Sequence, residues 1–206
     1  MLFKLLTLFS FLIVMLLLKR LVNILPSLLA CLVRGKESLN LEASVKLSRD
    51  RDALALAMII PFCLTAFRYR LYLPGFIESM APDAVLGLYF GILVTYLMLR
   101  LVMEWLLRPQ KMPKKTYAAA GKAAYSFFVV YTLLLLAVGG VLGILDVPEA
   151  GVRNVMLWIS AAIYGLFLIR KLQIFSSSCS VFVAFLYLCA LEMIPTGILV
   201  VSAIIF

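Results

Sequence analysis

The sequence predicts an all-α protein, a polytopic transmembrane helix bundle of about six spans that forms a single membrane domain over residues 1–206. Apolar residues make up 65% of the chain and charged residues only 14%, whereas a soluble domain is about half apolar and about a quarter charged. A soluble fold of this size has too little interior to bury so much apolar surface. The basic residues also cluster at the ends of long apolar windows, which is the pattern of membrane topology.

Six windows are apolar enough to cross the hydrocarbon core of a bilayer, or nearly so, as helices. They cover residues 2–18, 53–67, 84–107, 124–145, 154–169 and 181–206. The second and the fifth are short for a full span. We therefore expect basic side chains at their ends, such as Arg68, Arg70 and Arg170, to extend toward the membrane surface.

The first window is followed by a stretch that the sequence leaves open. Lys19 and Arg20 interrupt the apolar run, which resumes at Leu21 and continues to Val33 with Pro26 inside it. This second stretch is compatible with an interfacial helix or with half of a re-entrant hairpin. The choice decides whether the N-terminus lies outside or inside.

Residues 19–52 form a cytoplasmic linker in this scheme. Within it, residues 39–48 alternate apolar and polar, a period of two that is typical of a strand. No partner strand is predicted elsewhere, so we expect a short amphipathic segment on the membrane surface. Asp50 and Asp52 stand just before the second window, where either could cap its helix.

Basic residues are distributed unequally among the loops. Residues 19–52 contain seven Lys and Arg, residues 108–122 five and residues 170–171 two, whereas residues 68–83 contain two and residues 146–153 one. Because cytoplasmic loops retain Lys and Arg, we place the three richer segments inside. If the first window spans once, both termini then lie outside.

Small residues spaced four apart predict close helix packing in three windows. The pairs are Gly87 with Gly91, Gly139 with Gly143, and Ala161 with Gly165. They imply a compact core made by the third, fourth and fifth windows. The spacing is common in apolar sequence, so chance small residues are an equal interpretation.

Glu192 is the strongest candidate for a functional residue, because it lies near the middle of the last window. A carboxylate at the centre of a bilayer costs about 2.5 kcal/mol or more and needs a proton, a partner or a polar cavity. Pro195 cannot donate to the Leu191 carbonyl, which predicts a kink beside the acid. A proton or cation site is one interpretation. A structural acid paired with Arg or a hydroxyl is favoured, since no second ionisable group in the membrane is evident.

Other polar motifs predict less. Arg100 and Glu104, four residues apart near the end of the third window, predict a local ion pair worth a few tenths of a kcal/mol if exposed. Histidine is absent, and no glycine-rich phosphate loop occurs. The four cysteines lack metal-ligand spacing and are expected to be free thiols, three of them buried. The sequence predicts no catalytic site, no metal and no cofactor.

Several segments resemble a known family. They are residues 38–52, 61–63 and 68–72, followed by the most specific element, FLYLCALEMIP, at residues 185–195. Together they are similar to a multi-pass membrane family of Bacteroides-type bacteria, catalogued as domain of unknown function 4271. The resemblance implies a bacterial inner membrane and a family-wide role for the span that holds Glu192 and Pro195.

Three function classes remain open. The favoured one is a membrane-embedded interaction or assembly subunit, with the bilayer and a membrane protein or a second copy as partners. A secondary transporter or lipid-handling protein that uses Glu192 and the proline break is the alternative. A membrane enzyme is less favoured, since no group of convergent polar residues is evident. The net charge of +9 follows the membrane topology, so no nucleic-acid partner is predicted.

Overall fold

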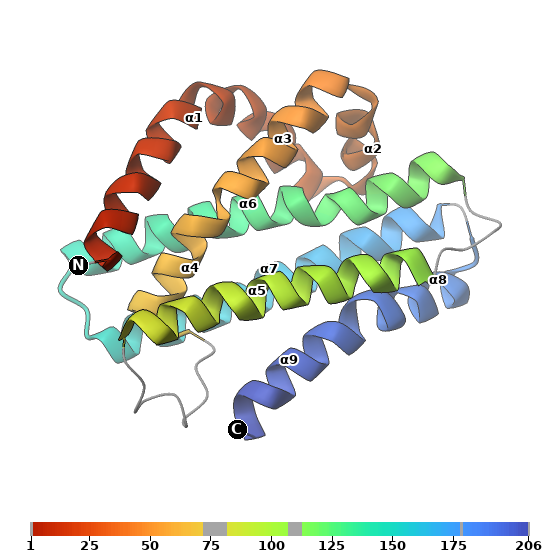
Figure 1. Cartoon of the computed structure of the whole chain (residues 1–206). Helices are drawn as coiled ribbons and strands as arrows, with labels where there is room; N and C mark the ends of the chain where they lie inside the picture. Colours follow the sequence, from red (N-terminus) through yellow and green to blue (C-terminus); the bar gives the residue numbers. More distant parts are fainter. Residues whose placement is uncertain (1, 72–81, 107–112, 178, 206) are drawn as a thin grey trace.

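A computed structural model of the chain describes residues 2–71, 82–106, 113–177 and 179–205. Figure 1 shows a bundle of helices, and the described residues contain no strand. The elements are α1 (Leu2–Val33), α2 (Gly35–Ala43), α3 (Val45–Ala57), α4 (Ile59–Arg68), α5 (Pro82–Leu106), α6 (Lys114–Ile144), α7 (Glu149–Ser176), α8 (Val181–Leu188), the π-helix η2 (Cys189–Met193) and α9 (Ile194–Ile205). The predicted all-α fold class is confirmed.

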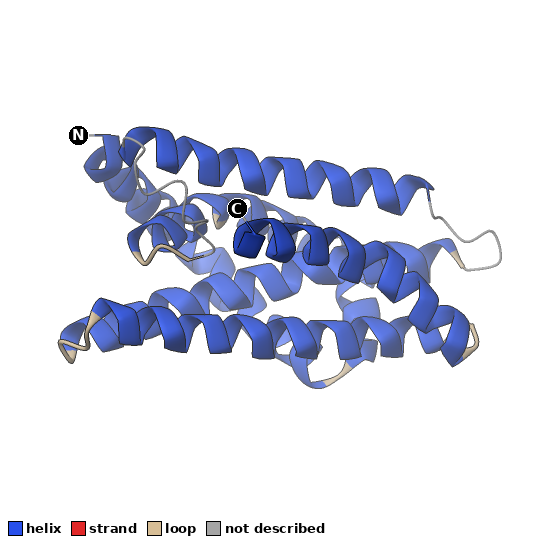
Figure 2. Ribbon diagram, turned by 90° about the horizontal axis from the view of Figure 1, so that it is seen from below, coloured by secondary structure: helices blue, strands red, loops and turns tan. Residues whose placement is uncertain are grey.

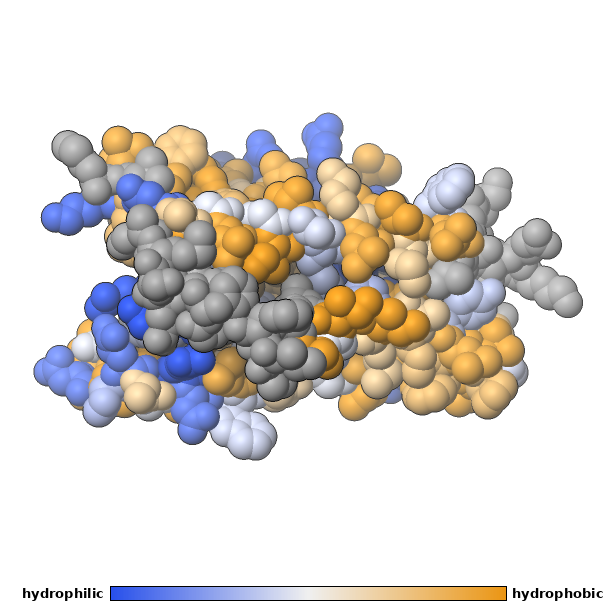
Figure 3. All heavy atoms as spheres, turned by 60° about the horizontal axis from the view of Figure 1, so that its bottom comes forward, coloured by the Kyte–Doolittle hydropathy of each residue, from blue (hydrophilic) through white to orange (hydrophobic). Residues whose placement is uncertain are grey.

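Five stretches of helix are long and apolar enough to cross a membrane. They are Phe3–Val33, Asp83–Leu106, Thr116–Ile144, Glu149–Ser176 and Val181–Ile198. Large apolar side chains on these helices point outward, and Leu16, Trp105 and Ile144 are each at least 80% exposed. Figure 3 shows apolar side chains over much of one face, with hydrophilic ones gathered toward one end. Lipid is the medium that suits such a surface, so the chain is a membrane protein.

The remaining predicted window, residues 53–67, is divided between two short helices. α3 has 13 residues and α4 has 10, and a single helix needs about 20 to cross the bilayer. The division falls at Met58, three residues before Pro61. Proline has no N–H to donate to the Ala57 carbonyl, so this turn lacks one backbone hydrogen bond, which favours a kink or a break here. α3 and α4 therefore form one bent rod (Figure 1).

The structure settles the form of the first 52 residues. Residues 2–33 form one helix with Pro26 inside it, and neither an interfacial helix nor a re-entrant hairpin interrupts it. The alternating residues 39–48 lie in the helices α2 and α3, so the strand interpretation is wrong. The expected caps are also wrong, because Asp50 and Asp52 lie inside α3, which begins at Val45.

The long helices α6 and α7 run side by side, whereas α5 packs against α4, η2 and α9 (Figures 1 and 2). α6 is central and contacts α1, α2, α3, α4 and α7. At what we call the basic end, α5 and α7 end, α6 and α8 begin, and α2 packs against α6 and α7. At the opposite end, the ring of Phe3 in α1 lies 5.5 Å from that of Phe67 in α4. α1 therefore begins at the opposite end and reaches the basic end once.

Candidate functional site: a charge cluster inside the bundle

The last predicted span is built from three consecutive pieces, α8, η2 and α9. In η2 the backbone N–H of Ile194 reaches back five residues to the carbonyl of Cys189, which widens the turn that holds Glu192. Pro195 follows at the start of α9 and cannot donate a backbone hydrogen bond. The hydroxyl of Tyr164, from α7, donates to the Glu192 carbonyl at 3.2 Å. The expected break beside Glu192 thus takes the form of a π-helix, a feature frequent at functional sites.

Glu192 points into the bundle and meets two cations there. Its Oε1 atom accepts from Lys171 Nζ of α7 and lies 3.0 Å from Arg100 Nη2 of α5. The side chains of Glu192 and Lys171 are 1% exposed, and that of Arg100 is 10% exposed. The expected inward orientation toward an arginine is confirmed. Three elements far apart in the sequence are held together at this carboxylate.

Glu104 is the fourth member of the cluster. Its Oε1 atom lies 3.2 Å from the same Arg100 Nη2 atom, and its side chain is 21% exposed. Gly121 of α6 makes room for this carboxylate, since a Cβ at that position would lie 3.3 Å from Glu104 Oε2. The Gly121 carbonyl also accepts from Arg100 Nη2 at 3.2 Å. We call Arg100, Glu104, Lys171 and Glu192 the membrane charge cluster.

Aromatic rings line the cationic side of the cluster. The ring centre of Phe167 lies 5.9 Å from Arg100 Cζ and 5.7 Å from Lys171 Nζ. The ring of Phe175 lies 5.7 Å from Lys171 Nζ. Contacts of this kind stabilise a cation by about 0.5–2 kcal/mol, with the larger values where the cation is desolvated. Two cations and two carboxylates leave the fully ionised cluster neutral, which lowers the cost of holding it inside a membrane.

Hydrogen bonding within the cluster is unevenly shared. Glu192 Oε1 accepts a hydrogen bond from Lys171 and forms an ion pair with Arg100. By contrast, Glu192 Oε2 and Arg100 Nε are buried and have no hydrogen-bond partner among the described residues. Buried polar atoms without partners are rare and costly in folded proteins. The cluster therefore has one free acceptor and one free donor beside its ion pairs.

Sequence reasoning found three of these four residues and missed Lys171. The Arg100–Glu104 pair is confirmed, but it is largely buried rather than exposed at the membrane surface. The expectation that no second ionisable residue lies near Glu192 in the membrane is wrong. The sequence predicts that Arg170 and Lys171 form a basic segment between two spans. Both lie inside α7, which continues to Ser176. A usable signal was present, because Phe167, Lys171 and Ile174 share the spacing of one helix face and all are buried.

The helix-packing prediction holds for one residue of six. Gly139 faces Met156 Cε and the Tyr69 ring, and the Tyr69 hydroxyl donates to its carbonyl at 3.3 Å. At four other glycines a Cβ would meet no atom of the described residues within 4 Å, namely at Gly87, Gly91, Gly143 and Gly165. Ala161 is exposed. For these five residues, close packing within a single chain is wrong, because their helix faces point out of the bundle.

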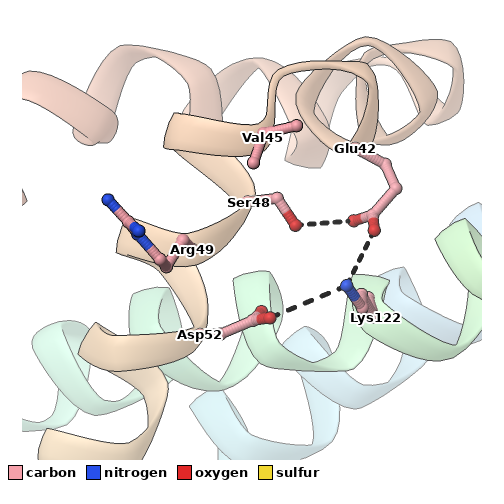
Figure 4. Close-up of a pocket in the computed structure, with 6 residues that line it drawn as sticks. All are labelled: Glu42, Val45, Ser48, Arg49, Asp52 and Lys122. Carbon is pink, nitrogen blue, oxygen red and sulfur yellow. Dashed lines mark hydrogen bonds and ion pairs between the residues drawn. The ribbon is translucent and has the colours of Figure 1, made fainter.

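A second charge group lies at the basic end, where α2, α3 and α6 meet. Glu42 and Asp52 each pair with both Arg51 and Lys122, at distances of 2.7–3.7 Å between nitrogen and oxygen. Figure 4 shows Glu42, Asp52 and Lys122 pointing toward one another, with Arg49 turned away. An open pocket of about 300 Å³ borders the group. We call Glu42, Arg51, Asp52 and Lys122 the surface charge ring.

Glu42 is the carboxylate of the surface charge ring whose ionised form its neighbours stabilise most clearly. Partial burial alone would raise its pKa, but the hydrogen bond from Lys122 and the charge of Arg51 outweigh that effect and lower the pKa below its usual value. Arg51 is only 1% exposed. The ring therefore joins α2 and α3 to α6 through ion pairs. Its α6 residue, Lys122, directly follows Gly121, whose carbonyl accepts from Arg100 of the membrane charge cluster.

The chain matches no family model, no curated protein and no solved structure. The resemblance of residues 185–195 to a family of bacterial membrane proteins thus stays a prediction. The described residues contain no group of three or more His, Cys, Asp or Glu placed to hold a metal ion. All four cysteines are free thiols, with Cys31 and Cys63 buried and Cys179 and Cys189 partly exposed, so one fewer is buried than expected.

Proposed function

We propose that the protein is a proton-linked secondary transporter of the bacterial inner membrane, in which Glu192 binds the transported proton. The observation that carries the proposal is the position of Glu192, which is 1% exposed and paired with Lys171 and Arg100 between membrane-crossing helices. Ionisable residues at such places are costly and typical of proton and ion pathways.

A purely structural role explains the cluster less well. Replacing a buried ion pair with well-packed apolar side chains is often neutral or stabilising, so such pairs are weak devices for holding helices together. The free atoms Glu192 Oε2 and Arg100 Nε add to the cost. The π-helix that carries Glu192 adds another, because a wide turn has poorer backbone geometry than an α-helix. These costs are expected where a group must change its protonation state.

The test is the protonation of Glu192 in a lipid bilayer. Infrared difference spectra of the purified protein in vesicles, recorded over a pH titration, should contain a carboxylic acid signal that disappears in Glu192→Gln. The same variant should abolish proton uptake driven by an imposed membrane potential. Glu149→Gln is the matched control, because Glu149 is 72% exposed in its pair with Arg68. A titration with no signal from Glu192 would overturn the proposal.

An assembly subunit is the second candidate, and exposed small residues favour it. Gly87 and Gly91 lie on one outward face of α5, with open space where their Cβ atoms would be. Small residues allow the backbones of two membrane helices to approach closely. Cross-linking in the native membrane separates the two candidates. A stable complex lost in Gly87→Leu, together with a silent Glu192, would favour assembly.

A further inference from the structure

Glu104 connects the membrane charge cluster with the surface of the protein. Its side chain is 21% exposed, whereas that of Glu192 is 1% exposed. Glu104 lies in the last turn of α5, at the basic end of the bundle. Of the two carboxylates in the cluster, Glu104 is therefore the more exposed and the nearer to the end of a span.

One nitrogen atom joins the two carboxylates. Arg100 Nη2 lies 3.0 Å from Glu192 Oε1, 3.2 Å from Glu104 Oε1 and 3.2 Å from the Gly121 carbonyl oxygen. This nitrogen carries two hydrogens and cannot satisfy three acceptors fully at once. The guanidinium is thus shared between Glu104 and Glu192, and a small movement favours whichever carboxylate is ionised.

The surroundings of Glu104 restrict where its carboxylate can go. The Tyr117 hydroxyl donates to the Glu104 carbonyl at 2.6 Å, which ties α5 to α6 at this turn. Gly121 leaves the space that both oxygens of the carboxylate occupy, since a Cβ there would lie 3.3 and 3.4 Å from them. Even an alanine Cβ at position 121 would oblige the carboxylate to shift by a few tenths of an ångström.

Among the described residues, few other titratable groups face the two carboxylates. α5 contributes Tyr96 and Arg100, α6 contributes Tyr117 and Tyr125, and α7 contributes Tyr164 and Lys171. The hydroxyl of Thr196 in α9 is hydrogen-bonded to that of Tyr96 and carries no charge. Tyrosine and arginine stay in one protonation state at neutral pH. Within the part of the chain that the structure describes, Glu104, Glu192 and Lys171 are therefore the groups left to exchange protons here.

We propose that Glu104 is the relay through which Glu192 exchanges protons with water at the basic end; this rests on the proposed function above. A hydronium ion at the basic end gives a proton to the Glu104 carboxylate and becomes water. The proton then passes to Glu192, which leaves Glu104 ionised and hydrogen-bonded to Arg100 Nη2, as it is in the structure. Each transfer breaks one O–H bond and forms another, so the two steps balance. We place one bridging water molecule between the two carboxylates, because Arg100 Nη2 lies 3.0 Å from Glu192 Oε1 and 3.2 Å from Glu104 Oε1.

The experiment measures how fast Glu192 becomes protonated after a pH jump, by time-resolved infrared spectroscopy on the whole protein in oriented vesicles. Glu104→Gln should slow the signal of Glu192 by about 100-fold when the jump is applied at the basic end. A jump applied at the opposite end should give an unchanged rate. Glu104→Asp should restore part of the lost rate, because it keeps the carboxylate.

Gly121→Ala provides a second variant that alters no charge. It displaces the Glu104 carboxylate and should also slow the exchange, whereas Gly143→Ala, at a glycine with open space around it, should not. An unchanged rate in both Glu104→Gln and Gly121→Ala, with Glu192 still titrating, would overturn the relay and leave the proposed function intact. The absence of any Glu192 titration would overturn both.

Discussion

Lys171 and Glu192 are 21 residues apart in the sequence and form an ion pair with each side chain 1% exposed. The pair joins α7 to the π-helix η2, and Arg100 adds a second cation from α5. Removal of one partner from a buried pair costs about 3–5 kcal/mol, because it leaves an uncompensated charge, whereas replacement of both partners is often neutral. The pair therefore allows a test in which two substitutions together are milder than one.

The first prediction concerns this pair. Glu192→Leu should lower the free energy of unfolding by about 3–5 kcal/mol, since Lys171 and Arg100 then share only Glu104. The double variant Lys171→Met with Glu192→Leu leaves the balanced pair Arg100–Glu104 and should recover most of that loss. Thermal melting in detergent measures both. The exposed pair Arg68–Glu149 is the control, where a single substitution should cost at most about 1 kcal/mol. Additive losses in the double variant would contradict the interpretation.

The sequence predicts the helices better than their contacts. Apolar windows of about 20 residues can hardly form anything but membrane helices, so the bundle follows from composition. Glu192 and Arg100 were identifiable because a charge inside an apolar window is conspicuous. Lys171 was not, since it lies next to Arg170 and just before a polar turn, as a topology-determining residue would. Only the continuation of α7 to Ser176 places it inside the bundle.

Gly121 is a second residue whose role could not be predicted from the sequence. Nothing in its local sequence distinguishes it from the glycines at Gly87 and Gly143, because its importance comes from Glu104 on a neighbouring helix. Spacing identifies small residues along one helix face, but it does not say which face another helix covers.

The second prediction concerns pH and the surface charge ring. The pKa of Glu42 is lowered in the folded protein, so its ionised form stabilises the fold. That contribution is fully present above the usual glutamate pKa of about 4.3 and is lost as the pH falls through the lower folded value. The protection factors of the amides of α2 and α3 against hydrogen exchange, each taken relative to the intrinsic rate at the same pH, should therefore fall at acidic pH. Glu42→Gln should show fast exchange already at neutral pH and a weaker pH dependence. A Glu42→Gln profile that matches the original protein would refute this role.

The third prediction concerns orientation. The basic end should face the cytoplasm, because it carries the segments rich in Lys and Arg. In a protein whose four cysteines are replaced by alanine or serine, a cysteine at Lys46 should resist an impermeant maleimide in intact cells. Cysteines at Lys4 and at Glu149, near the opposite end, should react. The reverse pattern would invert the topology and would place Glu104 on the outer side of the membrane.

The final prediction compares two glycines of α6 that share one sequence motif. At Gly139 a Cβ would lie 2.9 Å from Met156 Cε and 3.3 Å from the Tyr69 ring, whereas at Gly143 it would meet nothing within 4 Å. Met156 is fully buried, so its side chain has little room to move. Gly139→Val should therefore destabilise the protein by about 1–3 kcal/mol through overpacking. Gly143→Ala should be neutral or stabilise it by up to about 1 kcal/mol, because alanine favours the helix over glycine. Thermal melting of both variants in one detergent separates the two sites. If Gly143→Ala were instead the more damaging substitution, the outward face of α6 would have to be covered by another chain in the membrane.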